Sequence, residues 1–240
     1  MESPLHQFVV KELIPLHVAG YNISFTNSAL FMFLVVVGVT LLFFLGMRKS
    51  TLVPGRLQSI VELCFEFVDN MIDENIGEKG KPFFPFVLSL FLFILFGNLL
   101  GMLPYSFTFT SQIILTFSLA AMVFLLVTLV GIIRHGVKFL TYFMPEGAPL
   151  FFMPLLIPIE LISYLSRPVS LSIRLFANMM AGHTMMKVFA LFTIALGVGG
   201  ISTIAVNVLL IGFEFLVAFL QAYVFSVLTC LYLKDAIHLH

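Results

Sequence analysis

The chain has 240 residues, of which 60% are hydrophobic and 10% are charged, and its formal net charge is zero. Soluble domains are about 45–50% apolar and about 25% charged, so this composition excludes an ordinary soluble domain and indicates a polytopic membrane protein. The neutral balance gives no indication of a nucleic-acid partner, and the lipid bilayer is the partner that the composition predicts.

The first helix is expected soon after the N-terminus. Residues 1–26 are interrupted by charges and lack the pattern of a signal peptide. Residues 27–47 carry no charge, end just before Arg48 and Lys49, and are long enough to cross a bilayer. We therefore predict that residues 27–47 form an upright N-terminal transmembrane helix.

Residues 54–81 have a different pattern. Apolar residues recur at helical spacing, and four acidic residues lie on the opposite face: Glu62, Glu66, Asp69 and Asp73. This pattern predicts an amphipathic helix at the membrane interface, with a solvated linker helix as the alternative.

Residues 82–133 contain no charged residue. A turn sequence at 101–105 divides them into two expected helices, at about 84–103 and 112–133. We predict a helical hairpin with a short loop over 84–133.

The last region, 150–233, is predicted to be a long helical hairpin around the glycine turn at 197–200. Paired positions in an antiparallel hairpin have residue numbers with a constant sum. Three polar pairs have sums of 395, 397 and 395: Arg174 with Gln221, His183 with Glu214, and Glu160 with Asp235. The two residues of each pair are therefore expected to lie opposite each other, at the same height in the hairpin.

Arg174 is the most informative residue of this hairpin. A charge at bilayer depth costs at least about 2.5–3.5 kcal/mol, so a chain keeps one there for a function. Nine residues at about 100° each place His183 on the opposite side of the helix, whereas Ala177, Asn178 and Ala181 share the face of Arg174. Arg174 lies 23 residues before Gly197, or about 35 Å of helix against a half-thickness of about 15 Å, which predicts a strongly tilted hairpin.

Lys and Arg residues predict the orientation. Only Lys11 lies on the N-terminal side, and eight residues lie on the other: Arg48, Lys49, Arg56, Lys79, Lys81, Arg134, Lys138 and Lys234. The side with more positive charge is expected to be the cytoplasm or matrix, which places the N-terminus on the periplasmic or intermembrane side.

The candidate polar path consists of seven residues: Arg174, His183, Glu214, Gln221, Asn178, Asn98 and Glu160. The simpler alternative for His183 or Glu214 alone is a hydrogen bond to a neighbour, and for Asn98 an interhelical hydrogen bond. Cys64 and Cys230 have no metal-ligand spacing, and no phosphate loop or nucleophile with its base is present, so we expect no metal and no cofactor.

Three motifs carry a resemblance to a known family. The run 168–183, PVSLSIRLFANMMAGH, resembles the signature of subunit a of F-type ATP synthases. Residues 98–104, NLLGMLP, are similar to the middle motif of that family, and 220–225 and 231–233 are similar to its last helix. The resemblance covers nearly the whole chain, so residues 1–240 are expected to form one membrane domain.

The resemblance implies a stator subunit beside a rotating ring of c subunits, in a hetero-oligomeric complex with b-type peripheral-stalk subunits. Arg174 would face the ring carboxylates and separate two half-channels. Asn98, His183, Glu214 and Gln221 would line or border the inlet half-channel, and Glu160 would lie toward the outlet. ATP chemistry would belong to other subunits, so the chain would not be an enzyme by itself.

His183 and Glu214 also indicate a lineage. Many bacterial members of the family have Glu and His at these two positions, and the exchanged order here is that of mitochondrial and related alphaproteobacterial members. The resemblance therefore favours a mitochondrial or alphaproteobacterial inner membrane.

Two other classes of function stay open at this point. A secondary transporter would bind a substrate near the midplane, often between inverted repeats, but the chain has no visible repeat. A structural membrane scaffold would not need Arg174. The sequence leaves the choice between H⁺ and Na⁺ open.

Overall fold

The computed structural model describes residues 8–15, 17–18, 21–22, 24–48, 51, 53–103, 106–136, 139, 153–196 and 200–238. Most of them form helices, and five helical segments are long and apolar enough to cross a membrane. These segments are Asn27–Met47, Glu78–Gly101, Ile113–His135, Met153–Ala195 and Gly200–Ile237. The predicted class, an all-α polytopic membrane protein, is confirmed.

A small β structure precedes the first helix and was not predicted. β1 (Glu12–Ile14) pairs antiparallel with β4 (Phe25–Thr26), and β2 (His17–Val18) pairs antiparallel with β3 (Tyr21–Asn22). Strands of two or three residues are too short to show the alternation from which strands are predicted.

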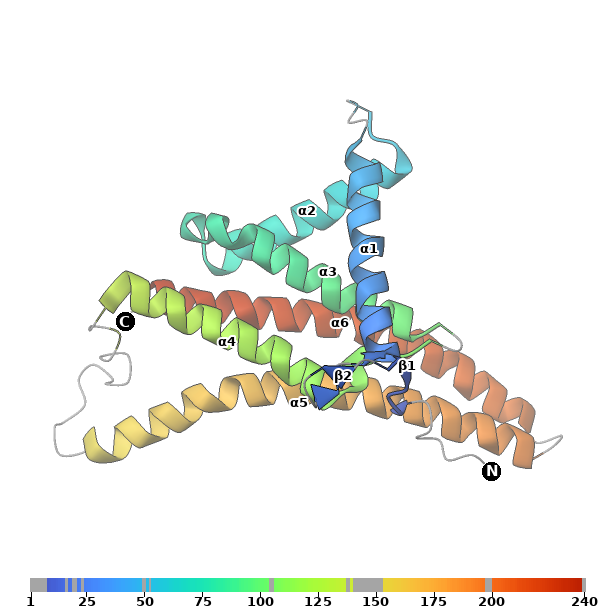
Figure 1. Ribbon diagram of the computed structural model, residues 1–240. Helices are drawn as coiled ribbons and strands as arrows, with labels where there is room; N and C mark the ends of the chain where they lie inside the picture. The colour runs from blue at the N-terminus through green and yellow to red at the C-terminus, as the bar shows by residue number, and fades with distance from the viewer. Residues whose placement is uncertain are drawn as a thin grey trace.

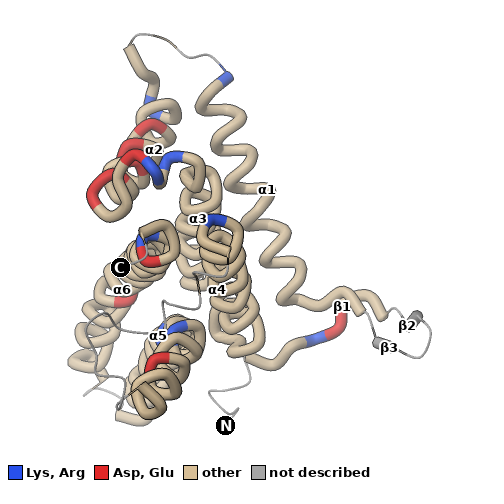
Figure 2. Tube along the Cα trace, turned by 90° about the vertical axis from the view of Figure 1, so that its left-hand side faces the viewer, with Lys and Arg blue, Asp and Glu red and all other residues tan. Residues whose placement is uncertain are grey.

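The helix α1 spans Asn27–Met47. It begins there because the Thr26 side chain accepts a hydrogen bond from the Ala29 backbone N–H at 3.3 Å, as an N-cap residue does. In Figure 1, α1 runs steeply across α5 (Met153–Ala195) and α6 (Gly200–Ile237), and Figure 2 shows the same relation from the side. If α1 crosses along the bilayer normal, the long hairpin of α5 and α6 is strongly tilted.

The helix α2 (Arg56–Asn75) is amphipathic. Its apolar face is buried at Val61, Val68, Met71 and Ile72, and its acidic residues are exposed. Figure 2 shows these acidic residues gathered on α2, away from the long hairpin. The helix ends before Gly77, whose φ of 79° favours glycine, and a 3₁₀ helix, η2 (Glu78–Phe83), leads into α3.

α3 (Phe84–Gly101) and α4 (Ile113–His135) form the next pair of helices. A 3₁₀ helix, η3 (Phe109–Ser111), lies between them. The turn predicted at 101–105 lies partly outside the described residues, because 104 and 105 are not among them.

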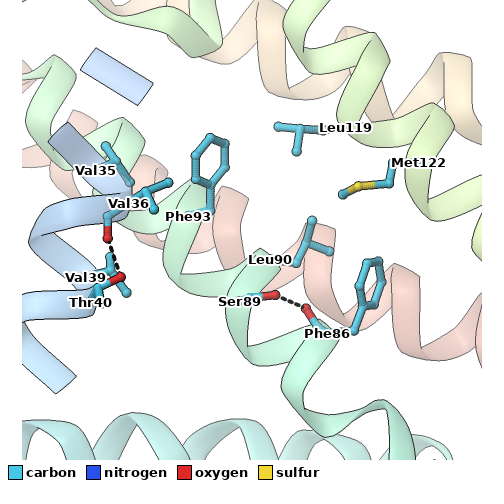
Figure 3. A pocket seen from close by; sticks show the side chains of 10 residues that line it. All are labelled: Val35, Val36, Val39, Thr40, Phe86, Ser89, Leu90, Phe93, Leu119 and Met122. Atoms are coloured by element: carbon cyan, nitrogen blue, oxygen red, sulfur yellow. Dashed lines mark hydrogen bonds between the residues drawn. The ribbon is translucent and has the colours of Figure 1, made fainter. Parts of the chain in front are cut away.

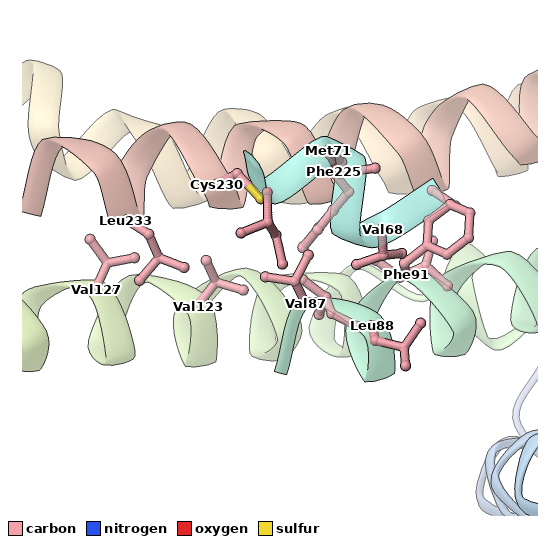
Figure 4. Packing of buried hydrophobic residues seen from close by; sticks show 14 of the residues in the cluster. Val68, Met71, Val87, Leu88, Phe91, Val123, Val127, Phe225, Cys230 and Leu233 are labelled. Atoms are coloured by element: carbon pink, nitrogen blue, oxygen red, sulfur yellow. The ribbon is translucent and has the colours of Figure 1, made fainter. Parts of the chain in front are cut away.

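The main core lies where α2, α3, α4 and α6 meet. Figure 4 shows Val68 and Phe91, from α2 and α3, packed with Val123 and Phe225, from α4 and α6. Cys230 is buried in the same cluster, and Cys64 is half-buried at its edge; both thiols are free. This core holds the middle of α6 against the other helices.

α1 contributes no fully buried residue to this core, and its own buried residues are Ser28, Val35 and Gly46. A cavity of about 380 Å³ lies between α1, α3 and α4, with Val36, Phe93 and Leu119 among its walls (Figure 3). None of its lining residues is charged, so this cavity does not belong to the polar path.

Candidate functional site

Side-chain contacts between α5 and α6 define the register of the long hairpin. The closest polar contacts along its length are Thr193 with Thr203 at 2.8 Å, His183 with Glu214 at 3.6 Å, Asn178 with Gln221 at 2.7 Å, and Arg167 with Asp235 at 3.0 Å. Residues 197–199 of the glycine turn predicted at 197–200 lie outside the described residues, but α5 ends at Ala195 and α6 begins at Gly200.

The predicted pairing of His183 with Glu214 is confirmed. Gln221 was predicted to lie opposite Arg174, but it accepts a hydrogen bond from Asn178, one helical turn further along α5. Arg174 and Gln221 nevertheless line the same cavity. The prediction that Glu160 and Asp235 lie opposite each other in the hairpin is wrong.

Asp235 pairs instead with Arg167. From the turn outward, the residue numbers of the observed pairs sum to 396, 397, 399 and 402. A constant sum requires straight, parallel helices, whereas α5 contains Pro158 and Pro168 and is curved in Figure 1.

The two faces of α5 differ as predicted. Arg174 and Asn178 are exposed, whereas Met179 and His183 are buried, with 0% and 7% of their surfaces exposed. Among the described residues, no ion pair or hydrogen bond to Arg174 is found. Arg174 is therefore an exposed cation on an apolar helix.

His183 lies at the centre of a buried polar group. Its Nε2 atom is 3.0 Å from the Thr108 hydroxyl and 3.6 Å from Oε1 of Glu214. Glu214 is 3% exposed, and neither of its carboxylate oxygens has a hydrogen-bond partner among the described residues. Buried carboxylates without partners are uncommon and mark sites that use protons or ions.

Thr108 was missed by the sequence analysis. It lies in the coil between α3 and η3, where no periodicity predicts its direction. The run of hydroxyl residues from Ser106 to Ser111, inside a stretch without charge, was the available signal.

Two glycines make room for this group. A Cβ atom on Gly182 would lie 2.7 Å from Oε1 of Glu214, and one on Gly101 would lie 2.6 Å from the Thr108 hydroxyl. The Gly101 carbonyl also accepts a hydrogen bond from that hydroxyl at 3.1 Å. Larger residues at either position would displace the polar atoms.

Two cavities approach His183 and Glu214 from different directions. The first, which we call the N-terminal cavity, has a volume of about 550 Å³ and is lined by Phe8, Lys11, Thr108 and His183 among others. The second, which we call the arginine cavity, has a volume of about 490 Å³ and is lined by Arg174, Asn178, Glu214 and Gln221 among others. The contact of His183 with Glu214 therefore bridges the two cavities.

Asn98 is fully buried on α3, and its Nδ2 donates a hydrogen bond to the Ala218 carbonyl of α6 at 3.3 Å. This contact is the interhelical hydrogen bond that the sequence analysis gave as the alternative. Glu160, by contrast, lies 14 residues before Arg174, about 21 Å along α5, and does not belong to either cavity.

A second polar cluster lies nearer the other end of the hairpin and was not predicted as a group. Arg167 forms its ion pair with Asp235 and lies over two aromatic rings, 5.5 Å from the centre of Tyr164 and 5.1 Å from that of Tyr232. The Tyr164 hydroxyl is 2.7 Å from the Thr128 hydroxyl of α4, which links the cluster to the neighbouring helix.

Comparison with known proteins gives one consistent result. The family model described as ATP synthase A chain matches residues 29–234. The chain is 55% identical to ATP synthase subunit a of Rhodospirillum rubrum over 241 residues, which cover 100% of both chains. It is 53% identical to the subunit a of Parvibaculum lavamentivorans over 98% of this chain and 94% of that one. It is 52% identical to the subunit a of Pelagibacter ubique, over 99% and 98%.

Proposed function

Since the chain belongs to the ATP synthase A chain family, we propose that it is the stator subunit that conducts protons through the membrane sector of an ATP synthase. In this proposal it offers two offset half-channels to a rotating ring of c subunits, and b-type stalk subunits hold it in place. The observation that carries the proposal is Arg174, an exposed cation on an apolar helix beside a cavity that reaches Glu214.

The inlet half-channel follows from the two cavities. Protons enter the N-terminal cavity, reach His183, pass to Glu214 and continue through the arginine cavity to the ring. Gln221 and Asn178 border the second part of this path, because both line the arginine cavity. Asn98 supports α6 through its hydrogen bond to Ala218.

Glu160 is assigned to the outlet side. It lies on the part of α5 that precedes Arg174, opposite in direction to His183. Arg174 therefore separates an inlet that ends at Gln221 from an outlet that continues toward Glu160.

The driving force for rotation is electrostatic. A ring carboxylate that faces lipid is protonated, because burying its charge is costly. Beside Arg174 the ionised form becomes favourable, so the proton leaves through one half-channel. The ionised carboxylate cannot return to lipid until a proton arrives through the other, and each proton that crosses supplies about 2.3 kcal/mol per 100 mV.

The family and the apolar helices also support a location. The relatives compared above are alphaproteobacterial, which fits an integral protein of the bacterial inner membrane. We place the N-terminus on the periplasmic side, because the excess of Lys and Arg lies on the other side. A secondary transporter with its own substrate is not favoured by the family to which the chain belongs.

Replacement of Arg174 tests the proposed function. We expect Arg174→Ala to abolish proton-driven ATP synthesis in membrane vesicles while the complex still assembles. Arg174→Lys should support little synthesis, because an ammonium lacks the planar fork of a guanidinium and would lose its proton more readily once the ring excludes water from this face. Substantial synthesis by the Ala variant, with the amount of complex measured by immunoblot, would contradict the proposal.

A further inference from the structure

We propose that Lys11 and Lys187 bind the phosphate group of an anionic phospholipid in the N-terminal cavity. The site is inferred from the charges, the fixed positions and the apolar walls of that cavity. Its effect on the entry of protons rests on the proposed function, because it concerns how protons approach His183.

The charged residues that line the N-terminal cavity have one sign. Lys11 and Lys187 line it, whereas none of the described residues that line it is Asp or Glu. Neither lysine takes part in an ion pair with a described residue. Glu12 follows Lys11 and Glu214 lies behind His183, but neither carboxylate lines the cavity. Two unpaired cations repel the protons that this path is proposed to admit, and an anion bound beside them removes the repulsion.

The positions of both lysines are set by the surrounding structure. The Lys11 backbone N–H donates a hydrogen bond to the Asn27 side-chain oxygen, and the Lys11 carbonyl accepts one from the Asn27 N–H, both at 3.1 Å. Asn27 is the first residue of α1, so Lys11 lies at the level where the chain enters the bilayer and where lipid phosphates are found. Lys187 is half-buried and lies one helical turn beyond His183 on the same face of α5.

The apolar walls of the cavity favour a phospholipid over free phosphate. Val9 and Leu103 line the cavity and are 50% and 56% exposed. Phe31 of α1 and Phe107 line it as well. Apolar side chains beside lysines match an acyl chain beside its phosphate, whereas an inorganic phosphate would leave the apolar surface in contact with water.

The test compares vesicles that contain the complete complex in phosphatidylcholine alone or in a mixture with phosphatidylglycerol. At a low proton concentration, where proton entry limits the rate, we expect phosphatidylglycerol to raise proton-driven ATP synthesis by the wild type about fivefold. This factor corresponds to about one contact between a lysine and an anionic lipid. The double variant Lys11→Gln with Lys187→Gln lacks both the repulsion and the site. It should therefore be faster than the wild type in phosphatidylcholine and respond to phosphatidylglycerol less than about twofold.

The matched control is Arg56→Gln with Lys79→Gln. It removes the same charge from two exposed residues that have no ion-pair partner among the described residues and do not line the cavity. This control should keep the full response to phosphatidylglycerol, and its loss would overturn the proposal. An equal response in the wild type and in the lysine double variant would also overturn it, because the lipid would then act only through the membrane surface.

Inorganic phosphate separates the two sources of the anion. Added on the N-terminal side of phosphatidylcholine vesicles, it should leave the wild-type rate unchanged. Stimulation as large as that by phosphatidylglycerol would overturn the choice of a lipid. A wild-type rate that is the same in both lipid compositions would overturn the site itself.

Thiol labelling measures occupancy of the cavity without removing either lysine. In a background without Cys64 and Cys230, Met186→Cys lines the cavity and should react with an uncharged maleimide about fivefold more slowly when phosphatidylglycerol is present. Val10→Cys is exposed and outside the cavity lining, so it should react equally in both compositions. Equal labelling of Met186→Cys in the two compositions would overturn the proposal. If the wild type made no ATP in either composition while this protection persisted, the proposed function would fail and the lipid site would stand.

Discussion

At the scale of single residues, the pair of His183 and Glu214 is held close but not in direct hydrogen-bond contact. The 3.6 Å between Nε2 and Oε1 exceeds the usual length of a hydrogen bond, although both side chains are buried. A small movement of either side chain, or one water molecule, would complete the contact. The pair is therefore suited to passing a proton rather than to stabilising the fold.

The exchange of these two residues tests whether they act as one unit. We expect His183→Ala and Glu214→Ala each to slow proton conduction through the stripped membrane sector without abolishing it, because water can partly bridge the gap. The exchanged variant, His183→Glu with Glu214→His, should retain more conduction than two independent losses predict. Strictly additive losses in this double-mutant cycle would mean that the two residues work separately.

Thr108 gives a second prediction at the residue scale. Its hydroxyl is within hydrogen-bond distance of both the Gly101 carbonyl and Nε2 of His183, so it fixes the ring that faces Glu214. We expect Thr108→Val to slow proton conduction about tenfold, from the loss of one buried hydrogen bond, and Thr108→Ser to keep most of it.

The neighbouring Thr110 provides a matched control for this prediction. It is 1% exposed, and its hydroxyl has no hydrogen-bond partner among the described residues. Thr110→Val should therefore leave conduction nearly unchanged. Equal effects of the two valine substitutions would show that Thr108 contributes only packing.

At the scale of helices, the sequence was sufficient where charge or helical periodicity fixes the geometry. α1 ends where the charge-free run does, just before Arg48, and the two faces of α5 follow from 3.6 residues per turn. The prediction that Glu160 lies opposite Asp235 was wrong, because a constant sum of residue numbers ignores the curvature of α5. Thr108 and the N-terminal strands could not be predicted, since tertiary contacts rather than local periodicity position them.

Cysteine pairs can measure the register of α5 against α6. In a background without Cys64 and Cys230, we expect a short bifunctional thiol reagent to join cysteines at 167 and 235, because the native side chains at these positions form an ion pair. Cysteines at 160 and 235 should not react, because 160 lies about 10 Å further along α5. Gel mobility after treatment with the reagent reports the crosslink.

The pair of Thr193 and Thr203, 2.8 Å apart near the turn, serves as the positive control for this measurement. Both the straight and the curved hairpin place these two residues together, so their crosslink shows that the variant has folded. Preferential reaction of 160 with 235 would restore the constant sum and contradict the curved register.

At the scale of the whole molecule, distant parts of the chain combine to close the N-terminal cavity. The Phe8 carbonyl accepts a hydrogen bond from the Gln112 side chain of the α4 N-terminus at 2.8 Å. The Phe8 ring meets that of His183 edge-on, with 6.4 Å between the ring centres. Asn27 also ties the segment down, because its side chain accepts a hydrogen bond from the Lys11 backbone at 3.1 Å. The N-terminal segment is thus a wall of the path that the proposed function requires.

Loosening this wall should expose the cavity to reagents from the N-terminal side. Gln112→Leu removes the hydrogen bond to Phe8, which contributes about 0.5–1.5 kcal/mol. The state in which the segment around Phe8 has left the cavity should therefore be populated about twofold to tenfold more. We expect the labelling rate of a cysteine at Met186, which lines the cavity, to rise by a similar factor with a membrane-impermeant thiol reagent. Gln58→Leu is the control, because the Gln58 side chain donates hydrogen bonds to Thr51, which precedes α2, and to Glu62 of α2, and it does not line the cavity. An unchanged or slower labelling rate in Gln112→Leu would mean that the segment does not cover the cavity, and the inlet would then have to be bounded by α3, α5 and η3 alone.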